Sequence, residues 1–512
     1  MHVCATAQLT KQQQIQKLNF VYQQIRNNYV DDVSLEPLVE EAVIATLKEL
    51  DPHSTYLNRE QVTAMRNRIS GEYAGIGIKY LLHNDTIVIC QTIAHSPAER
   101  AKISRGDCIV RIDNRAISGL SQDSIATLLK GELDSKVSLD IIRRGESNPL
   151  NITLKRDNID NSAISAAFRI GSVGYISVSA FSKPLATEFY AAYRELGDIE
   201  QLIIDLRDNG GGAISAAIDL TSLFLKKGDV MVTTEGRTDN FVYEKKTKTL
   251  IDLPLVVIIN EESASASEIF AGAIQDHDRG LIIGRRSYGK GLVQKVIDLK
   301  DGTALCLTTA RYKTPAGRII QRPYSMGGQD SYYSDMSRYN HEDSEVHPDS
   351  LTFRTLNSGR VVYGGGGIIP DIYIPRDEPQ AVEQYVIAAI EAGIVEQIIK
   401  QVYANGGLQR IIEEYETEQE FKDSFMLDSE VLLHLDTMLN DMNIPHVAIK
   451  QEEAMPQLLA YIKANIAQHI FGDVGYRYVY NTEYDSTLKQ AFDYACDVEL
   501  IDSILGGTKQ QQ

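Results

Sequence analysis

Two segments in the middle of the chain constrain its fold most, because each is a mostly apolar run that ends in a turn of small residues. The first is Leu202–Leu206, which leads into Gly210–Gly212, and the second is Leu255–Ile259, which leads into Ser263–Ser267. Short apolar runs bounded by turn residues indicate buried strands, and a helical stretch follows each turn. A third run, Ser172–Val178, has the same pattern. This alternation predicts an α/β region between residues 161 and 377.

The small residues that follow the first two strands suit a site where negative charge develops. Glycine and other small residues let the backbone approach a substrate closely and leave N–H groups free. One N–H group from each turn would be enough to form an oxyanion hole. A serine in the second turn also needs a base. Lys290, flanked by Gly289 and Gly291, can turn inward, where burial would lower the pKa of its ammonium group so that the neutral amine could deprotonate serine.

Residues 71–160 have a different pattern, of short alternating strands. Thr86–Cys90, Asp107–Ile112 and Val137–Ile142 have strand-like composition. Helical pieces that begin after the capping residues Ser96 and Ser121 interrupt these strands. The region is therefore expected to be a small domain rich in β structure.

A glycine loop stands before the first of these strands. A Gly-x-Gly-apolar sequence can direct consecutive backbone N–H groups toward one point, where they hold a carboxylate. Together with Ser96–Glu99 and Arg105–Asp113, which follow in order, the loop resembles that of a PDZ domain. The expected binding mode is strand addition by an extended peptide, with its terminal carboxylate held by four loop residues: Gly75, Ile76, Gly77 and Ile78.

The segments Ser263–Glu268 and Gly289–Gln294 together resemble the C-terminal processing (tail-specific) serine peptidases. The resemblance covers residues 15 to 377, because further family patterns occur in the same order: Leu50–Leu57, the PDZ-like region, Gly210–Gly212 and Tyr363–Asp371. It implies a multidomain α/β protein with a crotonase/ClpP-like catalytic core and an inserted PDZ domain. It also implies endopeptidase activity that requires no metal and no cofactor.

The resemblance also implies a role for each matching residue. Ser265 is the nucleophile, Lys290 is the general base 25 residues later, and Gln294 orients the lysine amine. The other expected roles are oxyanion donation by Gly211 and Ala266 and support by Glu268, Ser287 and Gly210. The chain departs slightly from the family pattern, with Glu262 where glycine is common and Ser287 where threonine is common. Neither departure removes a group that transfers protons.

Several alternatives compete with this interpretation. Asp276 and His277 could form a triad with Ser265, but adjacent residues on a helix face different directions and cannot relay a proton in line. Ser263 and Ser267 are interpreted as small packing residues, and Arg207 with Asp208 as residues that lock the glycine loop. Leu50–Leu57 is interpreted as structural. The chain could also be a catalytically silent PDZ scaffold or a crotonase-like acyl-CoA enzyme, although neither needs the serine and lysine motifs together.

The complete chain is predicted to contain four regions. Residues 1–70 form N-terminal helices, 71–160 the PDZ domain, 161–377 the peptidase core and 378–512 an acidic helical domain. The first assignment follows from apolar residues at helical spacing between Gln12 and Leu50. The multidomain organisation agrees with a length of 512 residues.

The net charge and the first residues of the chain indicate which partners the protein can have and where it is located. The net charge is −19, from 51 basic and 70 acidic residues, which excludes nucleic acid as a main partner. No apolar run is long enough to span a membrane, and the first residues lack the features of an intact signal peptide. The resemblance nevertheless implies an exported protein of the cell envelope or periplasm, acting on proteins or peptides with free C-terminal tails. Lipidation of Cys4 and homo-oligomerisation are left open.

Overall fold

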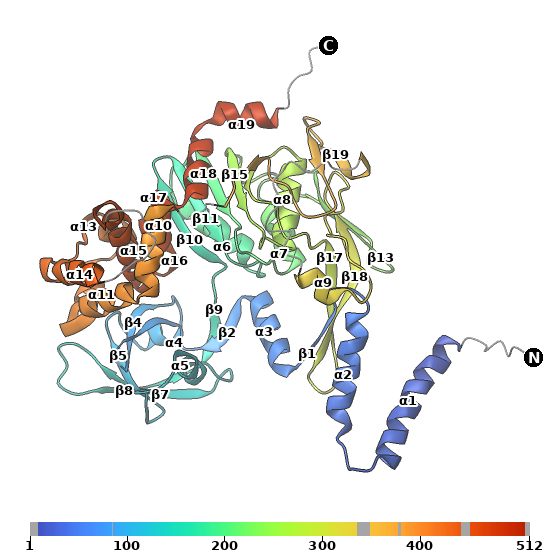
Figure 1. Cartoon of the computed structure of the whole chain (residues 1–512), viewed down its shortest axis with the longest axis horizontal. Helices are drawn as coiled ribbons and strands as arrows, with labels where there is room; N and C mark the ends of the chain where they lie inside the picture. The colour runs from blue at the N-terminus through green and yellow to red at the C-terminus, as the bar shows by residue number, and fades with distance from the viewer. Residues whose placement is uncertain (1–8, 84, 335–348, 377–379, 442–450, 507–512) are drawn as a thin grey trace, which may run out of the picture. The chain divides into compact units, whose positions relative to one another are not determined.

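The computed structural model describes residues 9–83, 85–334, 349–376, 380–441 and 451–506. These residues belong to two compact units, whose elements are labelled in Figure 1. The first unit comprises Met1–Thr63, Leu292–Ala310 and Pro323–Met336, and the second comprises Ala64–Gly291, Arg311–Arg322 and Ser337–Gln512.

The first unit combines N-terminal helices with strands from the middle of the chain. Its elements are α1 (Lys11–Asn28), α2 (Leu35–Lys48), β1 (Thr55–Leu57), β17 (Leu292–Asp298), most of β18 (Ala304–Lys313) and α9 (Gln329–Ser334), while α3 (Arg59–Ser70) continues into the second unit. β1 pairs antiparallel with β18. The turn before β1 is fixed by Asp51, whose carboxylate accepts from the backbone N–H groups of His53 and Ser54 and from the Thr308 hydroxyl. The structural interpretation of Leu50–Leu57 is confirmed.

Within the second unit, residues 72–160 form the predicted small β domain. β2 (Glu72–Gly75) and β9 (Asp157–Asp160) pair antiparallel where the chain enters and leaves it. The main sheet has the order β3-β4-β5-β7-β8, and β6 pairs with β5. The elements are β3 (Ile78–His83), β4 (Thr86–Thr92), α4 (Pro97–Arg100), β5 (Cys108–Ile112), β6 (Arg115–Ala116), α5 (Gln122–Leu129), β7 (Lys136–Ile142) and β8 (Leu150–Lys155). Ser96 and Ser121 cap α4 and α5 as predicted, because each hydroxyl accepts a backbone N–H three residues later.

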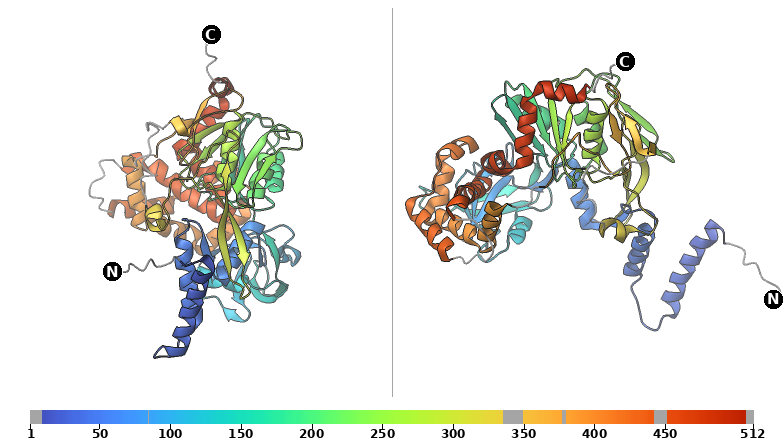
Figure 2. Two further views of the ribbon diagram at one scale, coloured as in Figure 1. Left: turned by 90° about the vertical axis from the view of Figure 1, so that its right-hand side faces the viewer. Right: turned by 45° about the horizontal axis from the view of Figure 1, so that its top comes forward.

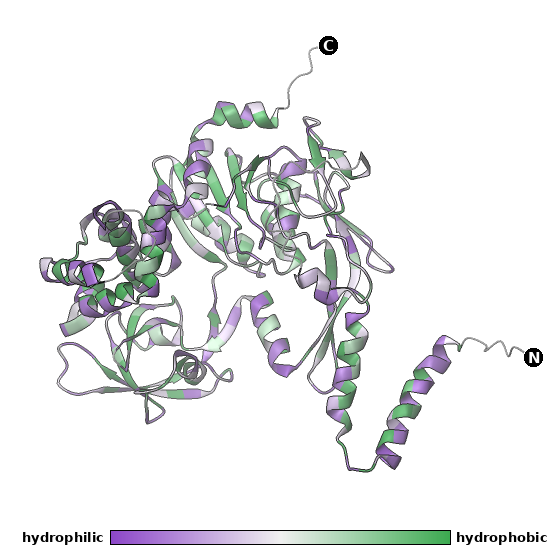
Figure 3. Ribbon diagram, in the orientation of Figure 1, coloured by the Kyte–Doolittle hydropathy of each residue, from purple (hydrophilic) through white to green (hydrophobic). Residues whose placement is uncertain are grey.

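The core of the second unit is a sheet with the order β10-β11-β12-β15-β16-β21, which is parallel from β11 to β21. Its strands are β10 (Ile164–Ile170), β11 (Val173–Val178), β12 (Gln201–Asp205), β15 (Leu255–Ile259), β16 (Leu281–Gly284) and β21 (Ile372–Tyr373). The central strands are hydrophobic along their length (Figure 3). All residues of β11 and β15 are buried, as strands covered on both faces require.

Helices cover both faces of this sheet. One face carries α6 (Leu185–Glu195), α7 (Ile214–Thr221) and α8 (Ala266–Asp276), and the other carries α18 (Ser486–Cys496) and α19 (Val498–Leu505). The second pair contributes Leu488 and Ile501 to one hydrophobic core with Ile203, Val256 and Ile258 of the sheet. Figure 2 shows these red C-terminal helices beside the strands. The chain returns from a distant part of its sequence to complete this three-layer arrangement. Smaller strands flank the core: β13 (Val230–Gly236), β14 (Phe241–Glu244), β19 (Thr352–Arg354) and β20 (Val361–Tyr363).

The remaining helices form a bundle around their own apolar core. They are α10 (Ala381–Glu391), α11 (Ile394–Tyr403), α12 (Gly407–Glu414), α13 (Glu418–Ser424), α14 (Ser429–Asp441), α15 (Gln451–Phe471), α16 (Asp473–Tyr476) and α17 (Thr482–Tyr484). Val88 and Cys90 of β4 belong to the same core, so the bundle packs on the β domain. The predicted multidomain α/β class with a helical C-terminal region is confirmed. In the described ranges, no helix combines the length and apolar character needed to cross a membrane.

Candidate active site

The parallel pairing of β12 with β15 brings the two predicted catalytic turns together. Ile204 lies beside Val257 and Asp205 beside Ile258, so both strands end at the same edge of the sheet. Ligands of open α/β sheets bind at this carboxyl edge. The glycine loop Leu206–Gly212 therefore lies next to the turn that carries Ser265.

Hydrogen bonds tie the glycine loop to the serine turn. The hydroxyl of Ser263 donates to the carbonyl of Leu206, and that of Ser267 donates to the carbonyl of Asn209, both at 2.8 Å. Both serines are fully buried. Their interpretation as mere packing residues is therefore incomplete, because their hydroxyls satisfy buried carbonyl groups of the neighbouring loop.

Ser265 has a backbone conformation that is unusual for a residue with a side chain. Its φ is 56° and its ψ is −109°, directly before the first residue of α8. A positive φ costs a non-glycine residue free energy, and such strain is concentrated at functional sites. The strained turn between β15 and α8 presents the half-buried Ser265 at the edge of the sheet.

A single buried carboxylate, that of Glu268, connects the serine turn with the lysine turn. Its Oε2 accepts from the backbone N–H groups of Ser265 at 2.8 Å and Lys290 at 2.9 Å. Its Oε1 accepts from the Ser287 hydroxyl at 2.6 Å and from the Gly289 N–H at 2.7 Å. Burial raises the pKa of Glu268, while these four donors act in the opposite direction. Glu268 thus fixes the backbones of Ser265 and Lys290 relative to each other.

Tyr312 makes a second connection between these two residues, which no sequence motif indicates. Its buried hydroxyl lies 3.1 Å from the carbonyl oxygen of Ser265 and 2.8 Å from that of Lys290. Burial, assisted by the charge of Glu268, raises the pKa of Tyr312 well above its usual value. At neutral pH the hydroxyl is therefore protonated and can donate to these carbonyl groups.

The two predicted oxyanion donors lie on either side of Ser265. Gly211 has a φ of +87°, and a Cβ added to it would lie 2.9 Å from the Ser265 Cβ, so only glycine fits there. The Gly211 N–H donates to the Asn209 side chain at 2.9 Å. The Ala266 N–H meets no acceptor in the part of the chain that the structure describes. Gly210 approaches Arg68, whose guanidinium would lie 3.4 Å from an added Cβ.

Gln294 belongs to the first unit, where it lies on β17. Its side-chain amide donates to the backbone carbonyl of His53. The expectation that Gln294 orients the lysine amine stays a prediction.

The alternative Ser–His–Asp triad finds no support in the surroundings of its two other members. Asp276 is fully buried and forms an ion pair with Arg318. The His277 Nε2 atom lies 2.7 Å from the carbonyl oxygen of Val230. Arg207 and Asp208 lock the loop as predicted, since Arg207 pairs with Asp205 at 2.7 Å and Asp208 exchanges two hydrogen bonds with Asn260.

Two features of the second predicted loop would suit a carboxylate ligand. Gly77 has a φ of +78°, and a Cβ added there would lie 2.2 Å from the Ser96 Cβ. In the described residues, the N–H groups of Ile76 and Gly77 donate to no acceptor. β3 follows the loop and, among the described strands, pairs only with β4, so that it stands at the edge of its sheet, while Ile125 of α5 shares its core. A peptide could therefore add to this edge with its carboxylate on the loop.

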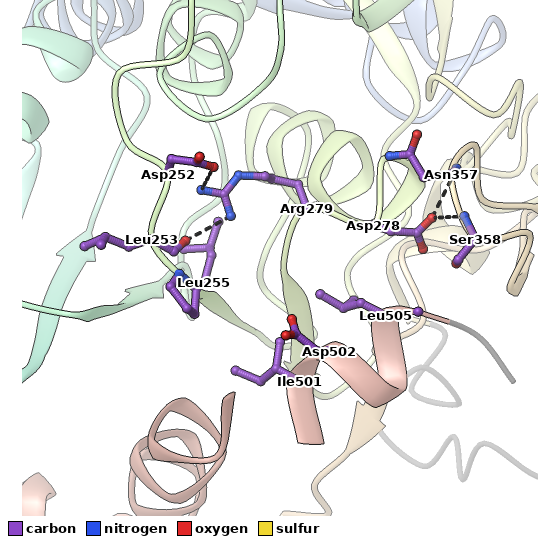
Figure 4. Close-up of a pocket in the computed structure, with 12 residues that line it drawn as sticks. Asp252, Leu253, Leu255, Asp278, Arg279, Asn357, Ser358, Ile501, Asp502 and Leu505 are labelled. Atoms are coloured by element: carbon purple, nitrogen blue, oxygen red, sulfur yellow. Dashed lines mark hydrogen bonds and ion pairs between the residues drawn. The ribbon is translucent and has the colours of Figure 1, made fainter. Parts of the chain in front are cut away.

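Two pockets flank the core. One of about 360 Å³ lies where the β domain joins the core and is lined by Arg68, Gly71, Lys130 and Ser182 among others. The other, of about 550 Å³, lies beneath α19 (Figure 4). There, Arg279 donates to the Leu253 carbonyl and Asp278 accepts from Ser358. These groups satisfy one another, so the second pocket has the character of a structural gap. No group of His, Cys, Asp or Glu residues within the described chain could hold a metal ion.

Known families match three parts of the chain. A model of peptidase family S41 matches residues 172–328, a PDZ-domain model matches 74–154, and a model of the N-terminal domain of the activating protease CtpB matches 2–61. The chain is 37% identical over 318 residues to a carboxy-terminal-processing protease of Bartonella bacilliformis, covering 60% of this chain and 73% of that protein. The chain belongs to the carboxy-terminal-processing proteases of peptidase family S41. It is a serine peptidase with a PDZ domain, as its motifs predicted.

This S41 peptidase is also similar to two proteins at lower sequence identity. It is 29% identical over 351 residues to a CtpA-like serine protease of Staphylococcus aureus, which covers 67% of this chain and 69% of that protein. Among solved structures, a photosystem II D1 C-terminal processing protease is 26% identical, covering 70% of this chain and 86% of that chain, with a TM-score of 0.35.

Proposed function

We propose that this S41 peptidase cleaves polypeptides near their C-terminal tails with a dyad of Ser265 and Lys290. The observation that carries the proposal is the buried Glu268 carboxylate, which binds the backbone N–H groups of both residues. This support serves a nucleophile and a base that must keep one geometry throughout the reaction. Gln294 orients the lysine amine, and Ser287 holds Glu268 in turn.

The proposed reaction needs only groups of the chain. The Ser265 Oγ attacks the scissile carbonyl carbon while the neutral Lys290 amine takes the hydroxyl proton. The N–H groups of Gly211 and Ala266 hold the oxyanion. To do so, the Gly211 N–H gives up its hydrogen bond to the Asn209 side chain and donates to the substrate oxygen instead. The Lys290 ammonium then protonates the leaving amine. Water attacks the acyl-enzyme ester with Lys290 again as base, and the proton returns to the Ser265 Oγ.

The proposed function includes an arrangement of four regions, a cellular location and an oligomeric state. The peptidase core, residues 161–377, is of the crotonase/ClpP-like type. It is preceded by N-terminal helices (1–70) and the PDZ domain (71–160), and followed by the helical region (378–512).

The enzyme acts in the cell envelope, on the periplasmic side. It forms a homo-oligomer through α1, which buries none of its residues and exposes Ile15, Leu18 and Phe20.

Covalent labelling combined with proteolysis tests the proposed activity. A fluorophosphonate is expected to form one adduct, on Ser265, and to stop the cleavage of an unfolded protein substrate. Mass spectrometry would identify both the adduct and the new termini. A labelled residue other than Ser265, or cleavage that survives complete labelling, would remove the basis of the proposal. An inert protein that still binds tail peptides would support the silent scaffold.

Blocking the carboxylate of a substrate tests the role of the PDZ domain. An unstructured substrate with an amidated C-terminus is expected to be cleaved at least about tenfold more slowly than the free acid, because charged hydrogen bonds at residues 75–78 are lost. Gly77→Ala should reduce the preference, because the added Cβ collides with Ser96. Gly119→Ala is the control, since Gly119 also has a positive φ but nothing lies near its Cβ position. Equal cleavage of the two substrates would show that the carboxylate is not recognised.

A further inference from the structure

Two residues of the C-terminal region reach the base of the catalytic glycine loop. Arg477 lies between α16 and α17, and Asp485 lies directly before α18. The Arg477 Nη1 atom lies 3.2 Å from the Asp205 carboxylate, and the Arg207 Nη1 atom lies 2.8 Å from the Asp485 carboxylate. Asp205 is the last residue of β12, immediately before the loop that lies against Ser265.

These contacts form one cluster of alternating charges around the buried Asp205. Asp205 is 1% exposed and also accepts from the Tyr175 hydroxyl at 2.7 Å. Burial alone would raise the pKa of Asp205, but Arg207 and Arg477 lower it to about 2. Asp205 therefore remains charged at neutral pH and attracts both guanidinium groups. Removing Asp485 leaves Arg207 with one acidic partner instead of two, and removing Arg477 leaves Asp205 with one basic partner instead of two. Either change unbalances the charge around a buried carboxylate, which favours a rearrangement of the groups near it.

The cluster controls the course of the loop because Arg207 lies within it. The Arg207 backbone N–H donates to Asp205 at 3.0 Å, and its guanidinium donates to both Asp205 and Asp485. Four residues later the chain reaches Gly211, beside the nucleophile. Asp485 has a second role, since its carboxylate also accepts from Leu488 N–H at 2.9 Å and caps α18. The helix that covers the sheet and the loop that binds substrate are thus held by the same carboxylate.

We propose that Arg477 and Asp485 are positioning residues of the peptidase, which hold the glycine loop where its N–H groups can bind the oxyanion. The proposal rests on the proposed function, and it gives the C-terminal region a part in catalysis without contact with the substrate. The loop is anchored on one side by hydrogen bonds to the serine turn and on the other by this cluster. Loss of the second anchor therefore affects transition-state binding more than substrate binding.

The test compares two helix-capping aspartates that undergo the same substitution. Asp497 caps α19 as Asp485 caps α18, accepting from the Leu500 N–H at 3.0 Å, but in the described residues it forms no ion pair. Asn can cap a helix, so Asp485→Asn and Asp497→Asn both keep the cap and lose one charge. Asp485→Asn is expected to lower kcat about 10- to 100-fold with KM within about twofold, whereas Asp497→Asn should retain wild-type values. The rate of fluorophosphonate labelling of Ser265 should fall together with kcat.

Thermal unfolding shows whether each variant is folded, and binding of a tail peptide shows whether its PDZ domain is intact. Wild-type kcat in a folded Asp485→Asn protein would overturn the proposal, and so would equal loss in both variants. If Asp485→Asn does not fold, Arg477→Lys, which keeps the charge but loses the planar fork, should show a smaller loss of kcat at unchanged KM. Wild-type kcat there would also overturn it. A wild-type enzyme that cleaves nothing contradicts the proposed function instead, because this comparison begins only once Ser265-dependent cleavage is measured.

Discussion

Ser265→Ala is expected to lower peptide hydrolysis by at least about 10⁴-fold while the protein stays folded. The substitution removes only the hydroxyl, which takes part in the capping box at the start of α8, so the unfolding temperature should fall only slightly. Lys290→Ala should have an effect of similar size, since the serine hydroxyl is a poor nucleophile without a base. Because both groups act in one step, the double variant should be no slower than either single variant. Initial rates with one unstructured fluorogenic peptide measure all three.

His277→Gln provides the matched control for this series. It changes the nearest histidine in the sequence, whose ring contacts the Val230 carbonyl, and Gln retains a donor for that carbonyl. This variant should keep most of the activity. A loss comparable to that of Ser265→Ala would restore the triad alternative, and normal cleavage by Lys290→Ala would exclude lysine as the base.

Substitution of Glu268 is expected to damage stability and activity together. Glu268→Ala leaves the buried donors of Ser265, Ser287, Gly289 and Lys290 without their acceptor. Each buried donor without a partner costs about 1–3 kcal/mol, so the free energy of unfolding should fall by several kcal/mol. Glu268→Gln keeps one of the two carboxylate oxygens and should have an intermediate effect. Chemical denaturation measures stability, and kcat at a temperature where each variant is folded measures the damage to the site.

The exposed Glu195 on α6 serves as the control for charge removal. Glu195→Gln should change the free energy of unfolding by no more than about 0.5 kcal/mol, and it should change kcat by no more than the factor that corresponds to this energy. If Glu268→Ala were as stable and as active as Glu195→Gln, the carboxylate would not be what holds the two catalytic turns together.

The parts of the fold that the sequence predicted are those governed by local patterns. The apolar run Leu255–Ile259 coincides with β15, and the capping serines Ser96 and Ser121 begin α4 and α5. Turn chemistry also identified the residues that flank the strands, because glycine and serine are required locally there. The two turns that are predicted to be catalytic were located for the same reason.

The unpredicted parts of the site depend on contacts between residues that are distant in the sequence. Tyr312 reaches Ser265 and Lys290 from β18, and Asp485 reaches Arg207 across 278 positions. A tyrosine in a strand and an aspartate before a helix each have an ordinary local explanation. Nothing in their neighbourhoods indicates the partner. Such contacts become visible only when the sheet order is known.

The placement of α18 and α19 has a consequence for how the enzyme matures. These helices bury one apolar face of the catalytic sheet, yet they follow Lys290 by about two hundred residues. Translation proceeds from the N-terminus, so the ribosome has made Ser265 and Lys290 long before it makes the layer that covers their sheet. A nascent chain that ends between them exposes Ile203, Val256 and Ile258 to solvent. The catalytic sheet therefore gains the cover of its second face only after most of the polypeptide has been synthesised.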